Sequence, residues 1–210
     1  MDAATAAKAR PDARRRLLDA AMQVIRGQGY SATSVDDICR IAGLTKGAFF
    51  HHFKSKEELA VAAAAHFSAM AEGLFAAAPY RQLSDPLDRL LGYIDFRAAI
   101  IEGPIPAFTC LLGTMVQEAY ATSPAIRQAC DTYIGLHAAE VAKDTAAAKA
   151  LYAPDAEWRA ESLALYTQAV LQGAFILAKA KNGNAIARDC VAHLRSYLEL
   201  LFHRSKQEEE

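Results

Sequence analysis

The side chains with the clearest chemical potential lie in residues 34–53, SVDDICRIAGLTKGAFFHHF. This stretch fits a short helix, a turn around Gly43 and a second short helix, which is the helix-turn-helix arrangement. Four side chains would project from the second helix: Thr45, Lys46, Ala48 and His52. A lysine in the first turn of such a helix can donate hydrogen bonds to guanine O6 and N7 in the major groove, or reach a phosphate. The stretch therefore indicates DNA recognition, with a generic helical hairpin as the alternative.

The charge distribution along the chain supports a polyanionic partner. The 210 residues have a formal net charge of only −1. Residues 1–56 contain ten Lys and Arg against five Asp and Glu, whereas residues 57–210 contain thirteen against nineteen. A basic segment in an otherwise acidic chain is typical of nucleic-acid binding. A chance imbalance in a window of this length is the alternative.

The composition excludes membrane and secreted proteins. At 53% hydrophobic and 22% charged residues, the chain lies in the ordinary range for globular proteins. No uncharged stretch reaches the ~20 residues that a transmembrane helix needs, and a polar segment without an apolar region follows Met1. Four cysteines lie far apart without a CxxC pair, which fits a reducing compartment. We therefore expect a cytoplasmic protein with no membrane partner.

Apolar residues at helical spacing predict the elements that position the motif. Thr33 or Ser34, Thr45 and Ser55 are candidate N-caps, and Glu58 completes a capping box with Ser55. The expected core of the first three helices consists of Leu17, Val24, Ile25, Val35, Ile38, Ile41, Leu44 and Phe49.

The whole chain is predicted to be all-α, with about nine helices and no sustained β alternation. Four helices are expected before Pro79, and five after it, at 85–102, 106–121, 124–150, 155–181 and 184–204. We expect an N-terminal arm (1–10), a helix-turn-helix domain (11–56) and a helical bundle (57–210). Basic residues near the start could form an arm in the minor groove or a solvated tail: Lys8, Arg10, Arg14, Arg15 and Arg16.

The segment TSVDDICRIAGLTKGAFFHHFKSKEEL resembles the N-terminal domain of TetR-family (tetracycline-repressor-like) bacterial transcription regulators, and the resemblance covers residues 12–60. AFTCLLGTMVQEAYATSPAIR also resembles the C-terminal domain of one branch of that family. The resemblance implies that Thr45, Lys46 and Ala48 face bases. It further implies phosphate contacts from Thr33, His52 and Lys56.

One position departs from the family pattern. Phe50 stands where members usually have a tyrosine whose hydroxyl often bonds a phosphate. Loss of that bond would cost about 1 kcal/mol. His51 or Arg40 could compensate as a phosphate contact.

The resemblance also implies an effector pocket in the bundle of residues 57–210. Semi-polar residues on otherwise apolar faces are its candidate lining: Arg97, Phe108, Glu118, Tyr120, His137, Tyr166, Gln168 and Gln172. Apolar walls with a few polar groups are typical of small-molecule sites. The nearby aromatic residues favour a hydrophobic effector of unknown identity.

The helices 155–181 and 184–204 are the candidates for a homodimer interface. Ala169 and Gly173 are small enough for close helix approach. An apolar stripe on the last helix contains Ile186, Cys190, Leu194, Leu198 and Leu201. The alternative is that this stripe packs within its own subunit.

The expected function is a homodimeric, ligand-responsive regulator, most often a repressor in this family, that leaves a palindromic DNA operator when a small molecule binds. A DNA-binding protein without an effector is one alternative, and redox sensing through Cys39, Cys110 or Cys130 is another. No nucleophile–base pairing, HExxH or phosphate loop occurs, so neither an enzyme nor a cofactor is expected. Adjacent His51 and His52 diverge by ~100° on a helix, which argues against a metal site.

Overall fold

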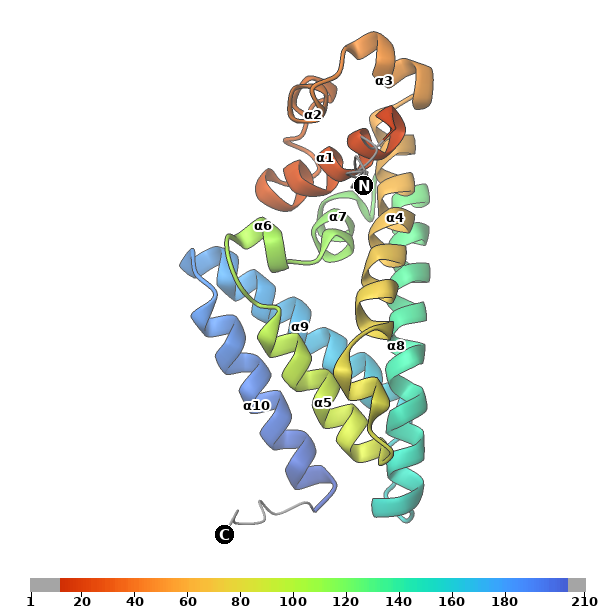
Figure 1. Ribbon diagram of the computed structural model, residues 1–210, viewed down its shortest axis with the longest axis vertical. Helices are drawn as coiled ribbons and strands as arrows, with labels where there is room; N and C mark the ends of the chain where they lie inside the picture. The colour runs from red at the N-terminus through yellow and green to blue at the C-terminus, as the bar shows by residue number, and fades with distance from the viewer. Residues whose placement is uncertain (1–11, 204–210) are drawn as a thin grey trace, which may run out of the picture.

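The computed structural model describes residues 12–203, and this part of the chain is helical without strands (Figure 1), which confirms the all-α prediction. Its ten α-helices and one 3₁₀ helix are α1 (Ala13–Gln28), α2 (Val35–Ala42), α3 (Lys46–His52), α4 (Lys56–Ala76), η1 (Pro79–Gln82), α5 (Pro86–Ala99), α6 (Ile105–Phe108), α7 (Leu111–Ala119), α8 (Pro124–Tyr152), α9 (Ala160–Lys181) and α10 (Ala185–Leu201). The expected arm (1–10), with Lys8 and Arg10, lies outside the described residues.

The helix predicted at 106–121 is two helices, because the backbone is extended at Thr109 and Cys110. Backbone groups at both ends of the break form hydrogen bonds with side chains within the break. The hydroxyl of Thr109 donates to the carbonyl of Ile105 (2.9 Å), and the thiol of Cys110 accepts from the amide of Gly113 as the N-cap of α7. The helix predicted from residue 155 begins later, at Ala160.

The N-caps predicted around the helix-turn-helix are confirmed. The side chains of Ser34, Thr45 and Ser55 accept from backbone amides three residues on, at 3.1, 3.1 and 3.0 Å. Asp37 returns a bond to the Ser34 amide, which completes a capping box on α2. Its hydrogen bonds with Ser34 lower the pKa of Asp37 to about 2. These local bonds fix where α2, α3 and α4 begin. Glu58, however, accepts from the amide of Lys54 and not from that of Ser55, so the capping box expected on α4 does not form.

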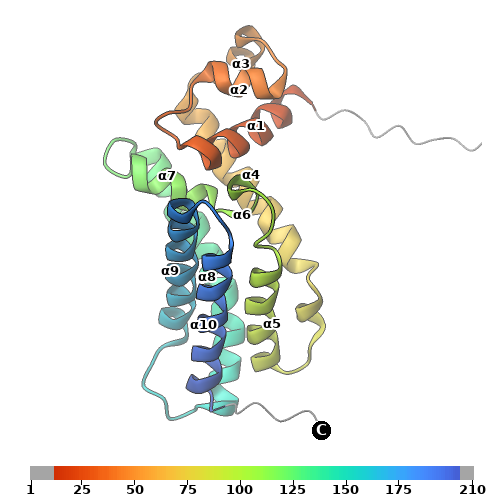
Figure 2. The ribbon, with the colours of Figure 1, turned by 90° about the vertical axis from the view of Figure 1, so that its left-hand side faces the viewer.

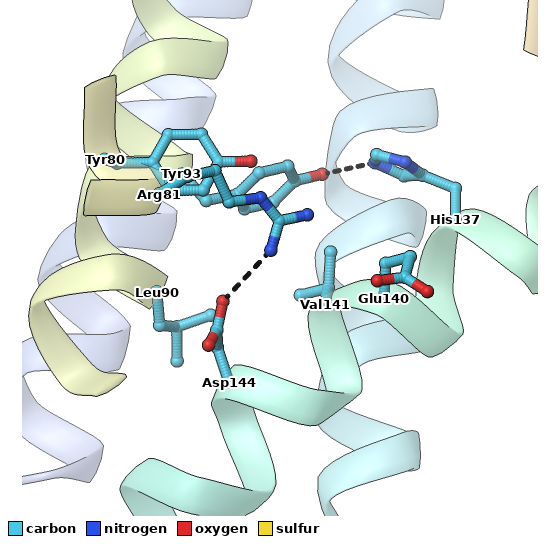
Figure 3. A pocket seen from close by; sticks show the side chains of 8 residues that line it. All are labelled: Tyr80, Arg81, Leu90, Tyr93, His137, Glu140, Val141 and Asp144. Atoms are coloured by element: carbon cyan, nitrogen blue, oxygen red, sulfur yellow. Dashed lines mark hydrogen bonds and ion pairs between the residues drawn. The ribbon is translucent and has the colours of Figure 1, made fainter. Parts of the chain in front are cut away.

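The helices α1, α2 and α3 gather at one end of the molecule, and α4 runs from them along α8 into the bundle (Figure 1). In the bundle, α8 packs against α5 and α9, and α10 packs against α5 and α9. The α9 and α10 helices lie side by side on one face (Figure 2). The interior between α5 and α8 contains Leu90, Tyr93 and Val141 (Figure 3).

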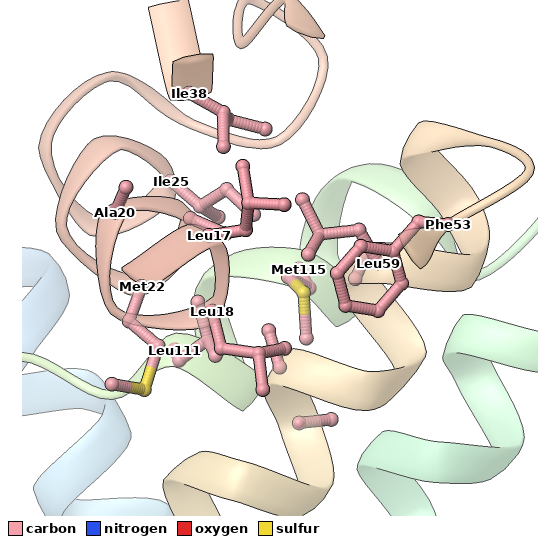
Figure 4. Close-up of a cluster of buried hydrophobic side chains, with 14 of the residues drawn as sticks. Leu17, Leu18, Ala20, Met22, Ile25, Ile38, Phe53, Leu59, Leu111 and Met115 are labelled. Carbon is pink, nitrogen blue, oxygen red and sulfur yellow. The ribbon is translucent and has the colours of Figure 1, made fainter. Parts of the chain in front are cut away.

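The core of the helix-turn-helix continues into the bundle (Figure 4). Leu17 and Ile25 of α1 pack with Ile38 of α2, as predicted, and the same cluster includes Leu111 and Met115 of α7. Ile41 is 41% exposed, so its predicted core position is wrong. On an eight-residue helix, only the face that contains Ile38 meets α1. The shared cluster couples the position of the helix-turn-helix to that of α7.

Among residues 12–203, two helices, α4 and α9, are long and apolar enough to cross a membrane by length and composition alone. In the fold, α4 packs against α1 and α8, and α9 packs against α8 and α10. Burial in a helical bundle needs apolar faces of this kind.

Candidate functional site

The first turn of α3 presents exposed polar side chains at one end of the helix-turn-helix. Thr45 uses its oxygen as the N-cap acceptor, which leaves its hydroxyl hydrogen free to donate outward. Lys46 is exposed and pairs with Asp36 of α2 at 2.9 Å. Both partners are more than half exposed, so this ion pair contributes roughly 0–1 kcal/mol and is easily exchanged for another anion. The sequence analysis did not identify Asp36 as the partner of Lys46.

The Lys56 ammonium makes its contacts within the helix-turn-helix domain. It donates to the carbonyls of Tyr30 (3.0 Å) and Thr33 (2.8 Å) and lies 4.4 Å from the centre of the Tyr30 ring. Thr33 is only 2% exposed, and its hydroxyl donates to the carbonyl of Gly29. The Thr33 side chain is therefore not available to a phosphate, contrary to expectation, because the loop before α2 uses it. Lys56 joins this loop to α4.

The other predicted phosphate contacts lie on the surface. Arg40 is exposed and bonds Asp37 at 3.0 Å. His51 is exposed and His52 half-buried at the end of α3, with their rings edge to face. Phe50 is 56% exposed and touches Phe49 edge-on, so the ring that replaces the family's tyrosine faces solvent.

Arg14 and Arg16, two of the basic residues near the start of the chain, make contacts within the helix-turn-helix domain. Arg16 donates to the carbonyls of Ala42 (2.6 Å) and Gly43 (3.1 Å), which satisfies the C-terminal end of α2. The Arg14 guanidinium lies 5.2 Å from the centre of the Phe53 ring. Arg16 therefore braces the turn before α3, whereas Arg15 is exposed on α1.

Inside the bundle, three polar side chains form a chain of hydrogen bonds. Gln168 donates to the Tyr93 hydroxyl (3.1 Å), which bonds Nε2 of His137 at 2.9 Å (Figure 3). Each of the three side chains thus has a hydrogen-bond partner within the interior. Burial, followed by the charges of Arg97 and Arg81, lowers the pKa of His137 to about 4. The imidazole is thus neutral at physiological pH.

Beside this chain lies a cation among aromatic rings. The Arg97 guanidinium carbon is 5.3 Å from the ring centre of Phe75 and 5.7 Å from that of Phe175. Within residues 12–203 its buried Nε has no hydrogen-bond partner. Phe108 of α6 packs against Phe175 with ring centres 6.1 Å apart. The structure thus brings together the predicted pocket residues Arg97 and Phe108.

Four predicted pocket residues lie near one another in this interior: Arg97, Phe108, His137 and Gln168. Gln172 packs instead on α7, where its Oε1 would lie 2.0 Å from a Cβ at Gly113. The sequence analysis overlooked Tyr93 and Phe75. Tyr93 precedes Arg97 by one helical turn on α5, a spacing that could have pointed to it.

Three other predicted pocket residues lie elsewhere. Glu118 accepts from the Ser31 amide (2.7 Å), which ties α7 to the loop after α1. Tyr120 is 61% exposed after α7, where no helix covers it. Tyr166 is exposed on α9 against Tyr197 of α10, with ring centres 5.4 Å apart. None of them faces the interior that contains Arg97.

Two hollows occur near these residues. One of about 10 Å³, room for a single water, adjoins Tyr93 and His137. The other is a cleft of about 580 Å³. It is lined by the end of α1, the α6 segment and the α9–α10 turn: Gly27, Gly103, Pro104, Ile105, Pro106, Lys179, Asn182, Gly183 and Asn184. The α6 segment therefore lies between this cleft and the aromatic interior.

The outer faces of α9 and α10 differ from the predicted interface. Leu194 and Leu198 are 2% and 0% exposed in the core with α5 and α9, so they pack within their own subunit. Ile186, Cys190 and Leu201 are partly buried against the same core, whereas Ala169 and Gly173 have open space. Large apolar side chains are exposed around them: Leu165, Tyr166, Ile176, Leu177, Tyr197 and Leu200.

The described residues show little sign of metal or thiol chemistry. Within residues 12–203 no three His, Cys, Asp or Glu side chains are placed to hold a metal ion. The four cysteines are free. Burial raises the pKa of Cys39 and, with Cys110 nearby, raises the pKa of Cys130 to about 12. Buried thiols with raised pKa values react slowly, because the thiolate is the nucleophile.

Comparisons with known proteins agree with this geometry. Residues 17–63 match the family model "Bacterial regulatory proteins, tetR family". The chain is 31% identical to the HTH-type transcriptional repressor DhaR of Mycobacterium sp. (strain GP1) over 119 residues, 57% of this chain and 58% of that protein. It is 42% identical to the HTH-type transcriptional regulator AcrR of Shigella flexneri over 48 residues, 23% of this chain and 22% of that protein. The matches thus span less than two thirds of these relatives.

Solved structures share the fold over most of the chain. A TetR regulatory protein from Rhodobacter sphaeroides superposes with a TM-score of 0.77 at 22% identity, covering 88% of this chain and 98% of that one. A TetR transcriptional regulator from Chloroflexus aurantiacus gives 0.76 at 25% identity, covering 89% and 93%. The helix-turn-helix segment thus matches the tetR family model, and the chain shares the fold of solved TetR regulators.

Proposed function

We propose that this protein is a DNA-binding transcription regulator, most simply a repressor. The observation that carries the proposal is the exposed first turn of α3, set by the Thr45 cap and braced by α2 through the Ile38 core. Such a helix can enter the major groove while its neighbour crosses the backbone. The relative DhaR is named a transcriptional repressor, which supports repression rather than activation.

The second part of the proposal is a homodimer through α9 and α10. Their outer faces expose Leu165, Ile176, Tyr197 and Leu200 beside the small residues Ala169 and Gly173. Contiguous exposed apolar surface of this kind is typical of protein interfaces. One seven-residue α3 reads few bases, whereas a two-fold pair reads both halves of a palindrome.

The third part is release from DNA by a small molecule bound between α5, α8 and α9. Phe108 links that interior to α6. Arg26 of α1 donates to the carbonyls of Ala107 (3.3 Å) and Thr109 (3.4 Å) at the end of α6. A ligand that displaces Phe108 would move the carbonyls that hold α1. The ligand needs only a higher affinity for the displaced state.

The smallness of the hollow beside His137 favours a second candidate, a DNA-binding regulator without an effector. The two candidates make the same DNA contacts and differ in their response to ligands.

The test is selection of binding sites from random duplexes, followed by fluorescence anisotropy on the selected site. We expect a palindromic site bound at nanomolar to tens-of-nanomolar Kd, with affinity falling as salt rises. A protein that selects no sequence, and binds duplexes no more tightly than bovine albumin does, would overturn the proposal.

A further inference from the structure

Arg97 lies among the buried elements of the bundle, and no carboxylate among the described residues pairs with it. Arg81 and Arg89 both bond Asp144, Arg188 bonds Glu102, and Arg195 bonds Asp95. Arg97 instead lies between Phe75 and Phe175, with a buried and unbonded Nε. An anion would give this buried Nε a partner, and the rings offer the guanidinium only part of that stabilisation.

The neighbours of Arg97 leave one charge uncompensated. His137 is neutral, and Tyr93 and Gln168 bond each other and His137 without contributing a negative charge. The immediate neighbours of Arg97 are therefore aromatic or uncharged, and none of them pairs with its charge. A guanidinium in such a site is the arrangement that recognises carboxylates, because its fork of donors matches two carboxylate oxygens.

Space for the rest of a ligand is available at α6. This four-residue helix contributes Phe108 to the aromatic interior, while Ile105 and Pro106 line the cleft of about 580 Å³ on its other side. Phe108 can thus move toward the cleft, and the ring of a ligand can then pack against Phe175 in its place. Phe108 is only partly buried, as are the other residues of α6 that face the core, so its ring can leave without opening a fully buried helix.

We propose that the effector is a small aromatic monocarboxylate whose carboxylate pairs with the Arg97 guanidinium while its ring takes the place of Phe108 against Phe175. This inference rests on the proposed function and names the chemical class of its effector. A bidentate ion pair in this interior would favour the acid strongly over its neutral amide. The hydroxyl of Tyr93 and the amide of Gln168 already bond each other, so Arg97 supplies the charge recognition.

The experiment uses the full-length protein and a panel of phenylacetate, 3-phenylpropanoate, 4-phenylbutanoate and indole-3-acetate, each beside its primary amide. Binding is measured by calorimetry for the wild type, Arg97→Met, Arg97→Lys and the matched control Arg159→Met. Arg159 is an exposed arginine outside the bundle interior. We expect at least one acid to bind, and its amide to bind about tenfold or more weakly.

Arg97→Met should lower the affinity for the acid by about tenfold or more, and Arg97→Lys should lower it by less. Arg159→Met should leave this affinity unchanged. Without ligand, Arg97→Met should melt no lower than the wild type, because the variant keeps an apolar stem and removes a buried Nε that has no partner. The inference is overturned if amides bind as well as acids, if Arg97→Met keeps the affinity, or if no acid binds at about 1 mM. It is also overturned if Arg97→Met melts roughly 5 °C or more below the wild type, since Arg97 would then be structural.

Anisotropy with the selected DNA site separates this inference from the proposed function. Normal DNA binding without any binding of acids rejects the effector class alone. Binding of acids that depends on Arg97, in a protein that binds no DNA, rejects the regulator alone. If both proposals hold, the bound acid lowers DNA affinity in the wild type and in Arg159→Met, and not in Arg97→Met.

Discussion

Lys46 and Lys56 have the same charge and lie ten residues apart, yet the fold gives them different tasks. Lys46 is held only by an exposed pair with Asp36, whereas Lys56 is anchored on two carbonyls and a tyrosine ring. A lysine that can leave its partner is able to contact a base or phosphate. A lysine whose ammonium is bonded to a loop stabilises the fold of the domain.

We expect Lys46→Ala to relax base preference at one position of each half-site, at a cost of about 1–3 kcal/mol. The reason is the loss of a donor to guanine O6 and N7 from the first turn of α3. Selection from random DNA measures this directly. Identical sequence logos for the wild type and the variant would reject base reading, and Asp36→Asn serves as a control that releases Lys46 without removing it.

Lys56→Ala should lower the free energy of unfolding by about 1.5–3 kcal/mol, because it removes charged hydrogen bonds to Tyr30 and Thr33. Urea unfolding measures this effect, with Lys54→Ala as the exposed control. The slope of log K for DNA against log salt then tests the phosphate contact. A slope reduced by about one unit indicates a phosphate contact, and an unchanged slope limits Lys56 to holding the loop.

His137 makes stability depend on pH. Its pKa is about 4 in the folded protein, against the ordinary value of 6.5 in the unfolded chain, so between these values only the unfolded chain takes up the proton. Stability is therefore full above pH 6.5 and falls as the pH drops toward 4. We expect the wild type to lose about 2 kcal/mol more than His137→Gln between pH 7 and pH 5 in urea unfolding. Equal losses would mean that the imidazole is not buried as described.

At the scale of elements, α10 has two apolar faces with different tasks. Leu194 is buried against the core, whereas Leu200 is 76% exposed. Leu194→Glu should destabilise the fold by more than the roughly 2–5 kcal/mol of a Leu→Ala change, because it also buries a charge. Leu200→Glu should leave the melting temperature of the subunit nearly unchanged. Circular dichroism on both variants checks this, and a stably folded Leu194→Glu protein would contradict the packing of α10.

At the scale of the whole molecule, the exposed faces of α9 and α10 predict a dimer of 22.7 kDa chains at micromolar concentration. Ile176→Glu should produce folded monomers, because it places a charge on the exposed apolar face of α9. Sedimentation equilibrium measures the mass, and anisotropy should show weaker binding to the palindrome. A variant that stays dimeric would place the interface elsewhere, and Arg159→Glu on the exposed N-cap of α9 is the control for added charge.

The sequence alone determined the features that depend on neighbours within one helical turn. The caps at Ser34, Thr45 and Ser55, the turn at Gly43 and the helix-turn-helix itself are local, because each bond spans three or four residues. The all-α class follows from the same periodicity. Helix ends and the break at Thr109 were less predictable, since the tertiary environment holds that residue extended.

Only the tertiary structure decided which side of each helix is covered and which polar groups meet. Periodicity places Leu194 and Leu198 on one stripe, but the packing of α5 and α9 on that stripe, and not of a second subunit, depends on distant segments. The same holds for Lys56, whose carbonyl partners at Tyr30 and Thr33 lie in the loop before α2. Arg97 is the clearest case: a sequence shows a charge, and only the folded chain shows that no carboxylate among the described residues comes near enough to pair with it.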